Sequence, residues 1–456
     1  MHRRIDAGRS LRENHPRRFP LNRSKRCDPN ASNAIGDRRG IHGEERVAEF
    51  ADYTWLIEDE AAAAWLARLA DDSRPALKQL DLLRRELPAE RARLIVEQTE
   101  LRRRAGTKFA GDASRMFFAP VLLEQATDRW IGRYKACRFQ SAAPGALIHD
   151  YCCGFGGDLI ALAQQNPCQG WDLSPLACLF ASANVQATCD ATAAQRTKVH
   201  QSNVEQLTPA PNEPWHFDPD RRATGRRSTT IDQHAPGPDT IDRWLAHSTS
   251  GAVKLAPATE PPAEWMQGAE LEWITSHREC RQLVAWFGSL ATSPSQRRAT
   301  IVNTDDRNPE QLVTGTFAGE PDVPFTISDQ THSYLYDPDP SIMAAGLLGA
   351  LADHHHLKSL GPGGAYLTGD QRFDDPLLQS FAVQDCLPLR PAAVAQHLGA
   401  RGVGRVEIKK RGVTIDPEKF RRDLKLRGDR EATVILTRIG KRQVAIIAQR
   451  TPTPQG

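Results

Sequence analysis

The chain has 456 residues, of which 40% are hydrophobic and 25% charged, and its formal net charge is +3 at pH 7. This composition predicts a globular protein, and the length predicts more than one domain. There is no run of about eighteen apolar residues and no apolar signal-peptide core, which excludes a predicted membrane span. The nine cysteines form no CxxC pair and no paired Cys/His spacing, so neither a zinc site nor a disulfide framework is expected. We therefore expect a cytoplasmic protein that binds no metal.

The first 43 residues are basic and lack an apolar period. They carry eleven Lys and Arg against four Asp and Glu, among scattered Pro, Asn, Gly and Ser. Residues 1–44 are therefore predicted to be a disordered tail, and residues 452–456 a second one. Electrostatic attraction to RNA is one interpretation of the basic tail, and a solvated segment or an extension left by a misplaced start codon is another.

Residues 45–138 show the apolar spacing of helices and are predicted to form a small helical domain. Pro88 is placed to open a helix that carries Leu94 and Leu101 seven residues apart. Further on, Thr127 is a candidate N-cap for the next helix. A basic helix could follow phosphates, although a solvated face is the favoured interpretation of its members, which are Arg91, Arg93, Arg102, Arg103 and Arg104.

A glycine-rich turn follows the first predicted strand of the core. Residues 148–150 form a short strand, and residues 159–163 resume as a helix. Gly154 and Gly156 allow the backbone between them to turn sharply, so that a ligand can approach bare backbone. The N–H groups that open the helix favour an anionic group. The two adjacent cysteines in this turn are interpreted as small filling residues rather than redox groups.

An acidic residue at the end of the second predicted strand indicates a ribose-binding site. Asp172 follows the glycines by roughly twenty residues, where a doubly wound fold binds a ribose diol. Ser174 and Pro175 then start a helix. A ribose site suits either a dinucleotide or S-adenosylmethionine. Leu159 stands where a dinucleotide-binding fold needs its third small residue, which favours S-adenosylmethionine.

The segments D-Y-C-C-G-F-G-G-D at residues 150–158 and W-D-L-S-P at residues 171–175 resemble the S-adenosylmethionine-dependent methyltransferases with a Rossmann-like core. More narrowly, they resemble the RNA cap guanine-N2 methyltransferase (trimethylguanosine synthase) family. From about Glu45 onward, the chain is similar to uncharacterised bacterial methyltransferases that carry a C-terminal THUMP-like domain. The resemblance implies an α/β fold with a Rossmann-like, seven-stranded methyltransferase core over residues 139–310, S-adenosylmethionine as the cofactor and RNA as the substrate.

The resemblance also implies which residues contact the cofactor. A segment before the core would fold over it as a lid and bring Gln125 and Thr127 against it, although a helix cap packed on the sheet edge explains the segment equally well. Asn203 falls where relatives contact the adenine, many of them through Asp, and a turn-forming Asn is the alternative. The implied cofactor residues of the core are Asp150, Cys153, Gly154, Gly156, Gly157, Asp158, Asp172, Leu173, Asn203 and Val204.

The fourth predicted strand, at residues 215–217, runs into a charged loop that is the expected catalytic loop. Amino-methyltransferase relatives carry [DNS]-P-P-[YFW] here: the first residue accepts hydrogen bonds from the target amine, and the ring stacks on the base. Asp218 and Pro219 match, whereas Asp220 and Arg221 replace the second proline and the ring. We take this form as a signature of the THUMP-like subgroup and expect Asp218, Pro219 and Arg221 to be catalytic. Alternatively, Asp218 caps a loop and the arginines are solvated.

Further strands are expected at residues 252–257, 271–275 and 299–302, with a helix through residues 283–287. These strands complete the seven of the core. Lys254 either points into the site or, as we favour, is solvated at a strand end.

Residues 311–375 are expected to connect the core to the last domain and to include a small-residue helix at residues 342–351. The run His354, His355 and His356 does not predict a metal site, because consecutive side chains diverge on a helix or a strand. The cation-favouring C-terminus of a helix explains the three histidines instead.

Residues 376–451 are predicted to form a compact α/β module. A strand runs into a basic turn at residues 403–412, a helix starts at Asp416, and two strands follow at residues 432–436 and 444–448. Residues 401–450 carry fifteen Lys and Arg against six Asp and Glu, which suits an RNA backbone. The module resembles the THUMP-like domain, which implies capture of RNA. The candidate phosphate contacts are Lys409, Lys410 and Arg411, with ordinary surface charge as the alternative.

We therefore predict an S-adenosylmethionine-dependent methyltransferase that methylates a base of a structured RNA presented by the THUMP-like domain. A methyltransferase of a small molecule or a protein is the first alternative. The second is a non-catalytic RNA-binding protein whose Rossmann core is a scaffold, and the intact Asp150, Gly154, Gly156 and Asp172 argue against it. No membrane partner is expected.

Overall fold

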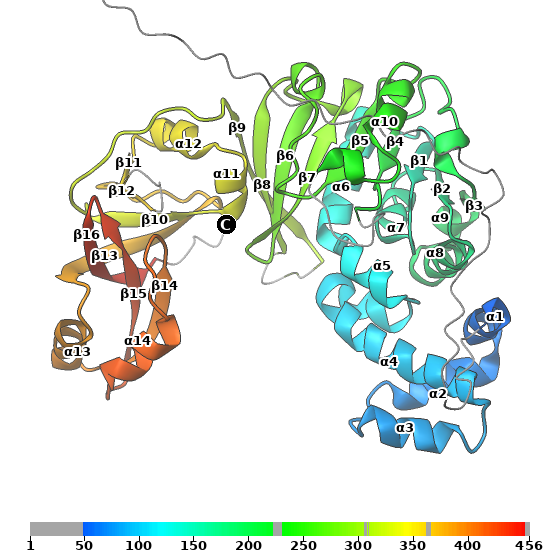
Figure 1. Cartoon of the computed structure of the whole chain (residues 1–456), viewed down its shortest axis with the longest axis horizontal. Helices are drawn as coiled ribbons and strands as arrows, with labels where there is room; N and C mark the ends of the chain where they lie inside the picture. The colour runs from blue at the N-terminus through cyan, green and yellow to red at the C-terminus, as the bar shows by residue number, and fades with distance from the viewer. Residues whose placement is uncertain (1–48, 222–229, 305–307, 309, 362–365, 452–456) are drawn as a thin grey trace, which may run out of the picture. The chain divides into compact units, whose positions relative to one another are not determined.

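The computed structural model describes residues 49–221, 230–304, 308, 310–361 and 366–451 of the chain. The predicted tails, at residues 1–44 and 452–456, lie outside the described residues. From Ala48 onward the chain forms one compact unit. Its parts are a helical region, a nine-stranded sheet and a seven-stranded sheet (Figure 1). Within the described ranges, no helix is both long and apolar enough to cross a membrane.

The helical region has its own apolar core. Asp59 caps the second helix by accepting a hydrogen bond from the N–H of Ala61 at 2.8 Å, and Pro88 precedes the long fourth helix as predicted. The apolar core of this region includes Phe155 and Phe180, which belong to the neighbouring sheet domain. The N-terminal helices are therefore packed directly against that domain. The helices are α1 (Phe50–Glu58), α2 (Glu60–Leu69), α3 (Ala76–Leu83), α4 (Ala89–Phe109), the 3-10 helix η1 (Ala110–Ser114), α5 (Pro120–Gln125) and α6 (Arg129–Ala142).

The first sheet carries the Rossmann-like core. Its strands are β1 (Ile148–Tyr151), β2 (Cys168–Asp172), β3 (Thr197–Gln201), β4 (Trp215–Phe217), β5 (Gly251–Leu255), β6 (Glu270–Ser276), β7 (Glu279–Trp286), β8 (Arg297–Thr304) and β9 (Leu312–Gly319). The spatial order is β3-β2-β1-β4-β5-β7-β6-β8-β9. Neighbouring strands are parallel except where β7 and β9 pair antiparallel with their neighbours.

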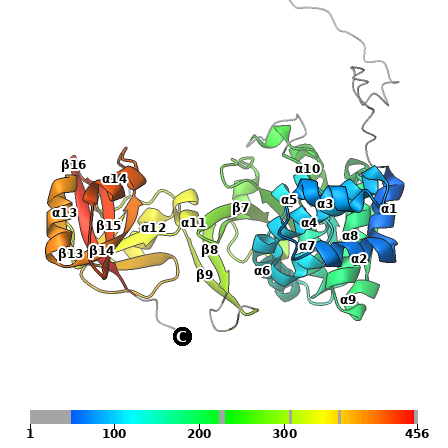
Figure 2. The same cartoon turned by 90° about the horizontal axis from the view of Figure 1, so that it is seen from below.

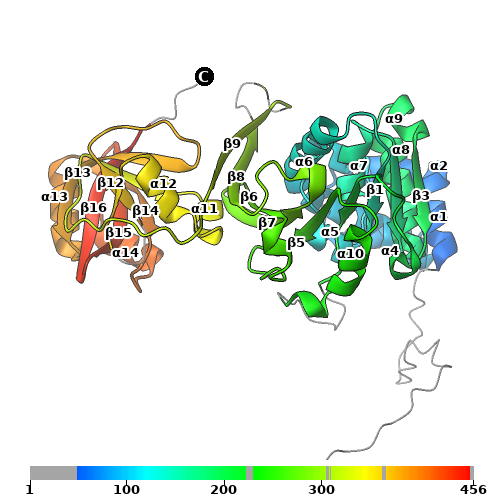
Figure 3. The same ribbon diagram turned by 90° about the horizontal axis from the view of Figure 1, so that it is seen from above.

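Helices cover both faces of this sheet. The helices after β1 are α7 (Gly157–Ala163), α8 (Pro175–Thr188), α9 (Ala191–Gln195), α10 (Pro238–Leu245) and the 3-10 helices η2 (Val204–Gln206), η3 (Ile231–Gln233), η4 (Trp265–Gln267) and η5 (Gly288–Leu290). Figure 3 shows these helices beside the strands of the first sheet. One apolar cluster joins the sheet to α6, α7 and α8, and a second joins it to α10. The predicted caps of α8 are confirmed, because Ser174 accepts a hydrogen bond from the N–H of Ala177 at 3.2 Å and Pro175 opens the helix.

The predicted helix at residues 283–287 is wrong, because residues 283–286 belong to strand β7 and Phe287 follows it in extended backbone. Strand β7 forms a hairpin with β6, and the turn between them is made by His277 and Arg278, which have φ of 50° and 61°. Both faces of the end of β7 are buried, so its sequence is continuously apolar and lacks the alternation of a half-exposed strand. The strand predicted at residues 299–302 is therefore β8, and the two strands that were not predicted, β7 and β9, bring the sheet from the expected seven strands to nine.

The second sheet has the order β11-β12-β10-β13-β16-β15-β14. Its strands are β10 (Tyr334–Pro338), β11 (Lys358–Ser359), β12 (Leu367–Gly369), β13 (Leu378–Pro388), β14 (Val403–Lys410), β15 (Arg430–Ile439) and β16 (Arg442–Arg450), with the helices α11 (Pro340–Ala344), α12 (Leu348–His354), α13 (Pro391–Ala400) and α14 (Pro417–Leu424). Helices α13 and α14 pack on this sheet (Figure 2). The predicted strands near the C-terminus are confirmed as β14, β15 and β16, and Asp416 caps α14.

Residues 311–375, which we expected only to connect domains, supply strands to both sheets. They form β9 of the first sheet and β10, β11 and β12 of the second. The single helix predicted at residues 342–351 is wrong. The segment forms two short helices, α11 and α12, because Gly346 between them adopts φ of 70°, which a right-handed helix cannot include.

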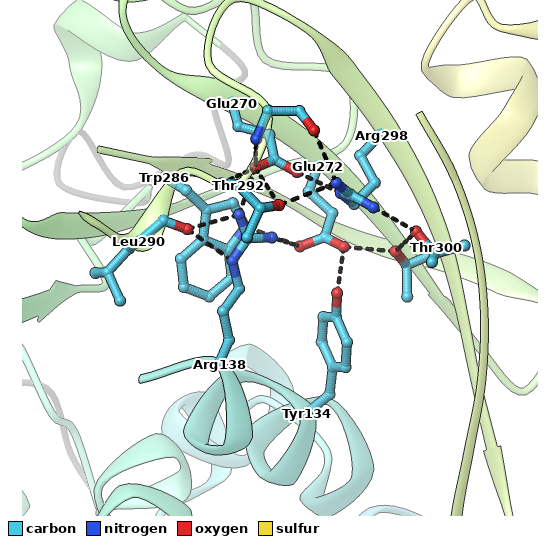
Figure 4. A network of polar contacts seen from close by, with 11 residues as sticks. Tyr134, Arg138, Glu270, Glu272, Trp286, Leu290, Thr292, Arg298 and Thr300 are labelled. Atoms are coloured by element: carbon cyan, nitrogen blue, oxygen red, sulfur yellow. Dashed lines mark hydrogen bonds and ion pairs between the residues drawn. The ribbon is translucent and has the colours of Figure 1, made fainter. Parts of the chain in front are cut away.

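A buried polar network joins α6 to the first sheet (Figure 4). Arg138 on α6 lies 2.5 Å from Oε2 of Glu270 and 3.0 Å from Oε2 of Glu272, and both glutamate side chains are fully buried on β6. Arg298 on β8 pairs with Glu270, and the hydroxyl of Tyr134 donates to Glu272 at 2.6 Å. Two guanidinium groups thus compensate two buried carboxylates.

We expect this network to make stability depend on acid pH through Glu270. Burial alone would raise the pKa of this carboxyl, but Arg138 and the hydrogen bond from Arg298 lower it from 4.5 to about 2. A carboxyl with a lowered pKa in the folded state stabilises the protein above its unfolded pKa, and this contribution is lost as pH falls from about 5 towards 2. Urea unfolding from pH 7 to pH 3 should show a weaker pH dependence for Glu270→Gln than for the native chain. Equal pH dependence would contradict the prediction.

Candidate active site

A cavity of about 590 Å³ opens at the carboxyl ends of β1, β2 and β4. Strand β1 pairs with β2 on one side and with β4 on the other, and the strand order reverses between β1 and β4 because the chain returns there from β3. Ligands bind at this kind of switch point in open parallel sheets. The structure brings most of the predicted site residues together in the wall of this cavity: Gln125, Thr127, Cys153, Gly154, Gly157, Asp158, Asp172, Leu173, Asn203, Val204, Asp218, Pro219 and Arg221.

The glycine turn between β1 and α7 needs glycine for its backbone. Gly154 and Gly156 adopt φ of 56° and 93°, where other residues are strained. A Cβ on Gly156 would also lie 3.4 Å from the backbone of Ala181, so this glycine sets the close approach of α8. Burial raises the pKa of the Cys152 and Cys153 thiols well above the usual range, which leaves them protonated and supports a filling role.

Asp172 is held rigidly at the wall of the cavity. Its Oδ2 accepts a hydrogen bond from the N–H of Gly154 at 2.9 Å, and its Oδ1 accepts one from the N–H of Ser174 at 2.9 Å. Leu173 beside it is 67% exposed, and Val121, which also lines the cavity, is 54% exposed. The cavity therefore presents a fixed carboxylate next to two uncovered apolar side chains.

Asn203 lines the cavity and also caps a turn. Its Oδ1 accepts a hydrogen bond from the N–H of Glu205 at 3.0 Å, which starts η2. The turn-forming alternative is thus realised, and it leaves the side-chain amide N–H groups of Asn203 at the cavity wall.

The loop after β4, which we expected from the sequence to be catalytic, is connected to the neighbouring strand and to α5. Oδ2 of Asp218 lies 2.7 Å from Nζ of Lys254 on β5, and Lys254 also donates to the carbonyl of Gln125 at 3.1 Å. Lys254 is buried, so our preference for a solvated lysine is wrong. The amide of Gln125 donates to Oδ1 of Asp220 at 3.1 Å, which joins α5 to the loop across the cavity.

Two predicted site residues do not line the cavity. Gly156 has no side chain, and its Cα faces Ala181 of α8. Asp150 is only 1% exposed, and its Oδ1 lies 2.7 Å from Nδ1 of His216 on β4. Asp150 therefore lies behind the cavity, where it is paired with the buried His216.

A buried chain of polar groups supports the glycine turn. From His216, the chain continues to Nζ of Lys135 at 3.0 Å, from Lys135 to Oδ1 of Asp158 at 2.6 Å, and from Oδ2 of Asp158 to the hydroxyl of Thr127 at 2.7 Å. Although burial favours a neutral carboxyl, Lys135 and His216 hold the pKa of Asp158 well below its usual range. The prediction that Thr127 caps α6 is wrong. Asp128 caps this helix by accepting hydrogen bonds from the N–H groups of Trp130 and Ile131.

The three predicted RNA contacts lie on and just after β14, outside the cavity. Lys409 and Arg411 lie 2.7 Å and 2.9 Å from the carboxylate of Asp337, which is buried. Lys410 is exposed and donates to the carbonyl of Ile415 at 2.9 Å. Two of the three cations therefore hold β14 against β10.

Comparison with known proteins identifies the family. A THUMP domain-like family model matches residues 378–450. Uncharacterised S-adenosylmethionine-dependent methyltransferases from two strains of Mycobacterium tuberculosis, CDC 1551 and H37Rv, are each 31% identical over 361 residues, which cover 77% of this chain and 94% of theirs. The chain belongs to the S-adenosylmethionine-dependent methyltransferases. The crystal structure of a putative methyltransferase from Porphyromonas gingivalis W83 has the same fold, with a TM-score of 0.67 and 18% identity over 89% of this chain and 100% of that one.

S-adenosylmethionine is the cofactor of this methyltransferase, and the cavity fits it. A volume of about 590 Å³ is that of a small-molecule site. The fixed carboxylate of Asp172 can accept hydrogen bonds from a diol, and the exposed side chain of Leu173 offers an apolar surface to a base. Sequence patterns did not reveal Lys135 and His216, since a lysine within a helix and a histidine within a strand carry no local signal of a shared network.

Proposed function

We propose that this methyltransferase methylates a base of a structured RNA that the THUMP-like domain presents to the cavity. The observation that carries the proposal is the charge of that domain: residues 401–450 hold fifteen Lys and Arg against six Asp and Glu. Its helix α14 exposes Lys419, Arg421 and Arg422, which suits a phosphate backbone. The reaction would take place in the cytoplasm.

We assign the cofactor to the glycine-turn cavity. Asp172 would accept hydrogen bonds from the ribose hydroxyls, and Asn203 with Val204 and Leu173 would contact the adenine. Gly154 and Gly157 would let the amino-acid portion approach the backbone, with Asp158 and Cys153 beside it and Gln125 and Thr127 covering it. When bound, S-adenosylmethionine supplies a methyl group that its sulfonium already makes electrophilic.

We assign the acceptor to the loop after β4. Asp218 is held through Oδ2 by Lys254, which leaves Oδ1 to accept a hydrogen bond from an amine and to take up its proton. Pro219 stiffens the loop behind this carboxylate. Arg221 stands where related enzymes carry a ring, and its planar guanidinium can stack on a base or bind a phosphate. Most of the rate enhancement would come from orientation.

The test is transfer of labelled methyl from S-adenosylmethionine into the RNA, protein and small-molecule fractions of an extract from a host that lacks this gene. We expect label in RNA. A charge-reversed variant with Lys410→Glu, Lys419→Glu and Arg422→Glu should lose about tenfold or more of this labelling, and its RNA affinity should depend less steeply on salt. Lys409 and Arg411 are left intact because they bind Asp337.

The matched control reverses three exposed cations of the helical region, Lys78, Arg84 and Arg85. This control should label RNA like the native chain, and both variants should bind S-adenosylhomocysteine normally in calorimetry. Label in the protein or small-molecule fraction would contradict the proposal, as would RNA labelling that does not change in the charge-reversed variant.

A further inference from the structure

A second cavity, of about 610 Å³, adjoins the cofactor cavity. The two cavities share Gln125, Ala126, Thr127 and Arg221 in their walls. Beyond them, the second cavity is lined by the end of α4, the start of α6, Lys254 of β5 and the β6–β7 hairpin. Lys254 is the partner of Asp218, so the second cavity begins beside the proposed acceptor position.

An irregularity in the hairpin directs two consecutive side chains into this cavity. Ile274 on β6 pairs with Gln282 on β7, but the next residue, Thr275, pairs with Cys280, so Arg281 is an extra residue in β7. Regular strands point consecutive side chains to opposite faces, whereas a bulge redirects them. Both Arg281 and Gln282 therefore line the cavity.

Gln282 carries an unsatisfied hydrogen-bonding group at this wall. The residue is 2% exposed, and its Oε1 has no hydrogen-bond partner among the described residues. Buried amide groups in folded proteins are almost always hydrogen-bonded. A primary amide can both donate and accept, so Gln282 is suited to the polar edge of a base or to a sugar hydroxyl.

The charges around the cavity leave a positive excess. Its carboxylates are engaged or exposed: Asp128 caps α6, Glu124 lies at the surface, and Glu279 pairs at 3.0 Å with Arg281, where both side chains are largely solvated. Lys254 is neutralised by Asp218. The cavity is thus lined by four cations, Lys108, Arg221, Lys254 and Arg281, and by the three carboxylates of Glu124, Asp128 and Glu279, together with His277.

Lys108 faces backbone oxygens rather than a carboxylate. Its Nζ donates to the carbonyls of Leu123, Glu124 and Ala126 at 2.8, 3.1 and 3.0 Å. Burial, followed by repulsion from Lys254 and Arg281, lowers the pKa of Lys108 to about 8. A bound anion would relieve this repulsion, and the exposed pair of Arg281 and Glu279 is weak enough to open for it.

We propose that the second cavity is the acceptor subsite of the enzyme and binds a phosphate-bearing nucleotide. Arg281 binds the phosphate, the positive charge of Lys108 attracts it, Gln282 hydrogen-bonds the nucleoside, and the shared wall at Gln125 and Arg221 opens towards Asp218. This inference rests on the proposed function. It means that the second cavity recognises the target nucleotide, in addition to any binding of RNA by the THUMP-like domain.

The test is calorimetry on the full chain saturated with S-adenosylhomocysteine, titrated with each of the four nucleoside 5′-monophosphates, the corresponding nucleosides and inorganic phosphate. At least one monophosphate should bind about tenfold more tightly than its nucleoside and than inorganic phosphate. Arg281→Gln should lower its affinity about tenfold, and this exposed position leaves the fold intact. Gln282→Leu should lower the affinity for the monophosphate but not for inorganic phosphate.

Arg278→Gln is the matched control, because Arg278 lies on the same hairpin, is exposed and lines neither cavity. Its nucleotide affinity should equal that of the native chain. Absence of monophosphate binding, equal affinity for inorganic phosphate, or an unchanged affinity in Arg281→Gln would overturn the inference. If the native chain did not bind S-adenosylhomocysteine, the assigned cofactor site would be overturned instead. Failure of the acceptor subsite and failure of the cofactor site are therefore distinguishable.

Discussion

Arg138→Ala is expected to destabilise the fold by about 3–5 kcal/mol. The guanidinium of Arg138 contacts Glu270 and Glu272, whose side chains are both fully buried (Figure 4). Removing it leaves Arg298 as the remaining cation for two buried carboxylates, and water cannot replace the lost charge. It also removes the hydrogen bonds that Arg138 donates to the carbonyl of Leu290. Urea unfolding at pH 7 measures the loss.

Arg133→Ala is the control on the same helix. Arg133 lies 3.6 Å from Glu310, whose side chain is 66% exposed, and such pairs contribute about 0 to 1 kcal/mol. In addition, Glu272→Gln should recover part of the loss when combined with Arg138→Ala, because it removes one of the uncompensated charges. The prediction fails if Arg133→Ala and Arg138→Ala cost the same, or if the combined variant is less stable than the sum of the single variants implies.

Asp218→Asn is expected to slow methyl transfer about 100-fold or more while leaving the affinity for S-adenosylhomocysteine within about twofold. The amide keeps the shape of the side chain but cannot take up a proton, and it weakens the contact with Lys254 at 2.7 Å. Because Asp172, rather than Asp218, is the carboxylate held by the glycine turn, cofactor binding should persist. Single-turnover transfer to the labelled RNA fraction and calorimetry measure the two quantities.

Asp232→Asn provides the control for this second prediction, since Asp232 is exposed on η3, which follows the loop after β4. It should change neither quantity. Lys254→Met should reduce the transfer rate less than Asp218→Asn, because Lys254 positions the carboxylate and does not itself accept the proton. A native rate in Asp218→Asn, or a loss of rate matched by a loss of cofactor affinity, would remove Asp218 from the proposed catalytic role.

Much of the core could be predicted because its signals are local. Ser174 and Pro175 start α8 through bonds within one helical turn, and Asp416 does the same for α14. Gly154 and Gly156 predict a turn whose backbone conformation only glycine adopts easily. Local signals misled where burial altered the pattern: β7 is apolar on both faces and was predicted as a helix, and Thr127 was predicted as a cap next to Asp128, which is the cap.

The family, the cofactor and the segments that form the cavity could be recognised in the amino-acid sequence, because a glycine turn and an acidic strand end are each encoded by neighbouring residues. The pairing of charged groups became visible only in the folded chain. Lys135 is brought to Asp158 and His216, Lys254 to Asp218, and Lys409 with Arg411 to Asp337. These partners are far apart in the chain, and their pairing follows from which side chains are buried together, since a buried charge must find a partner wherever the fold brings one.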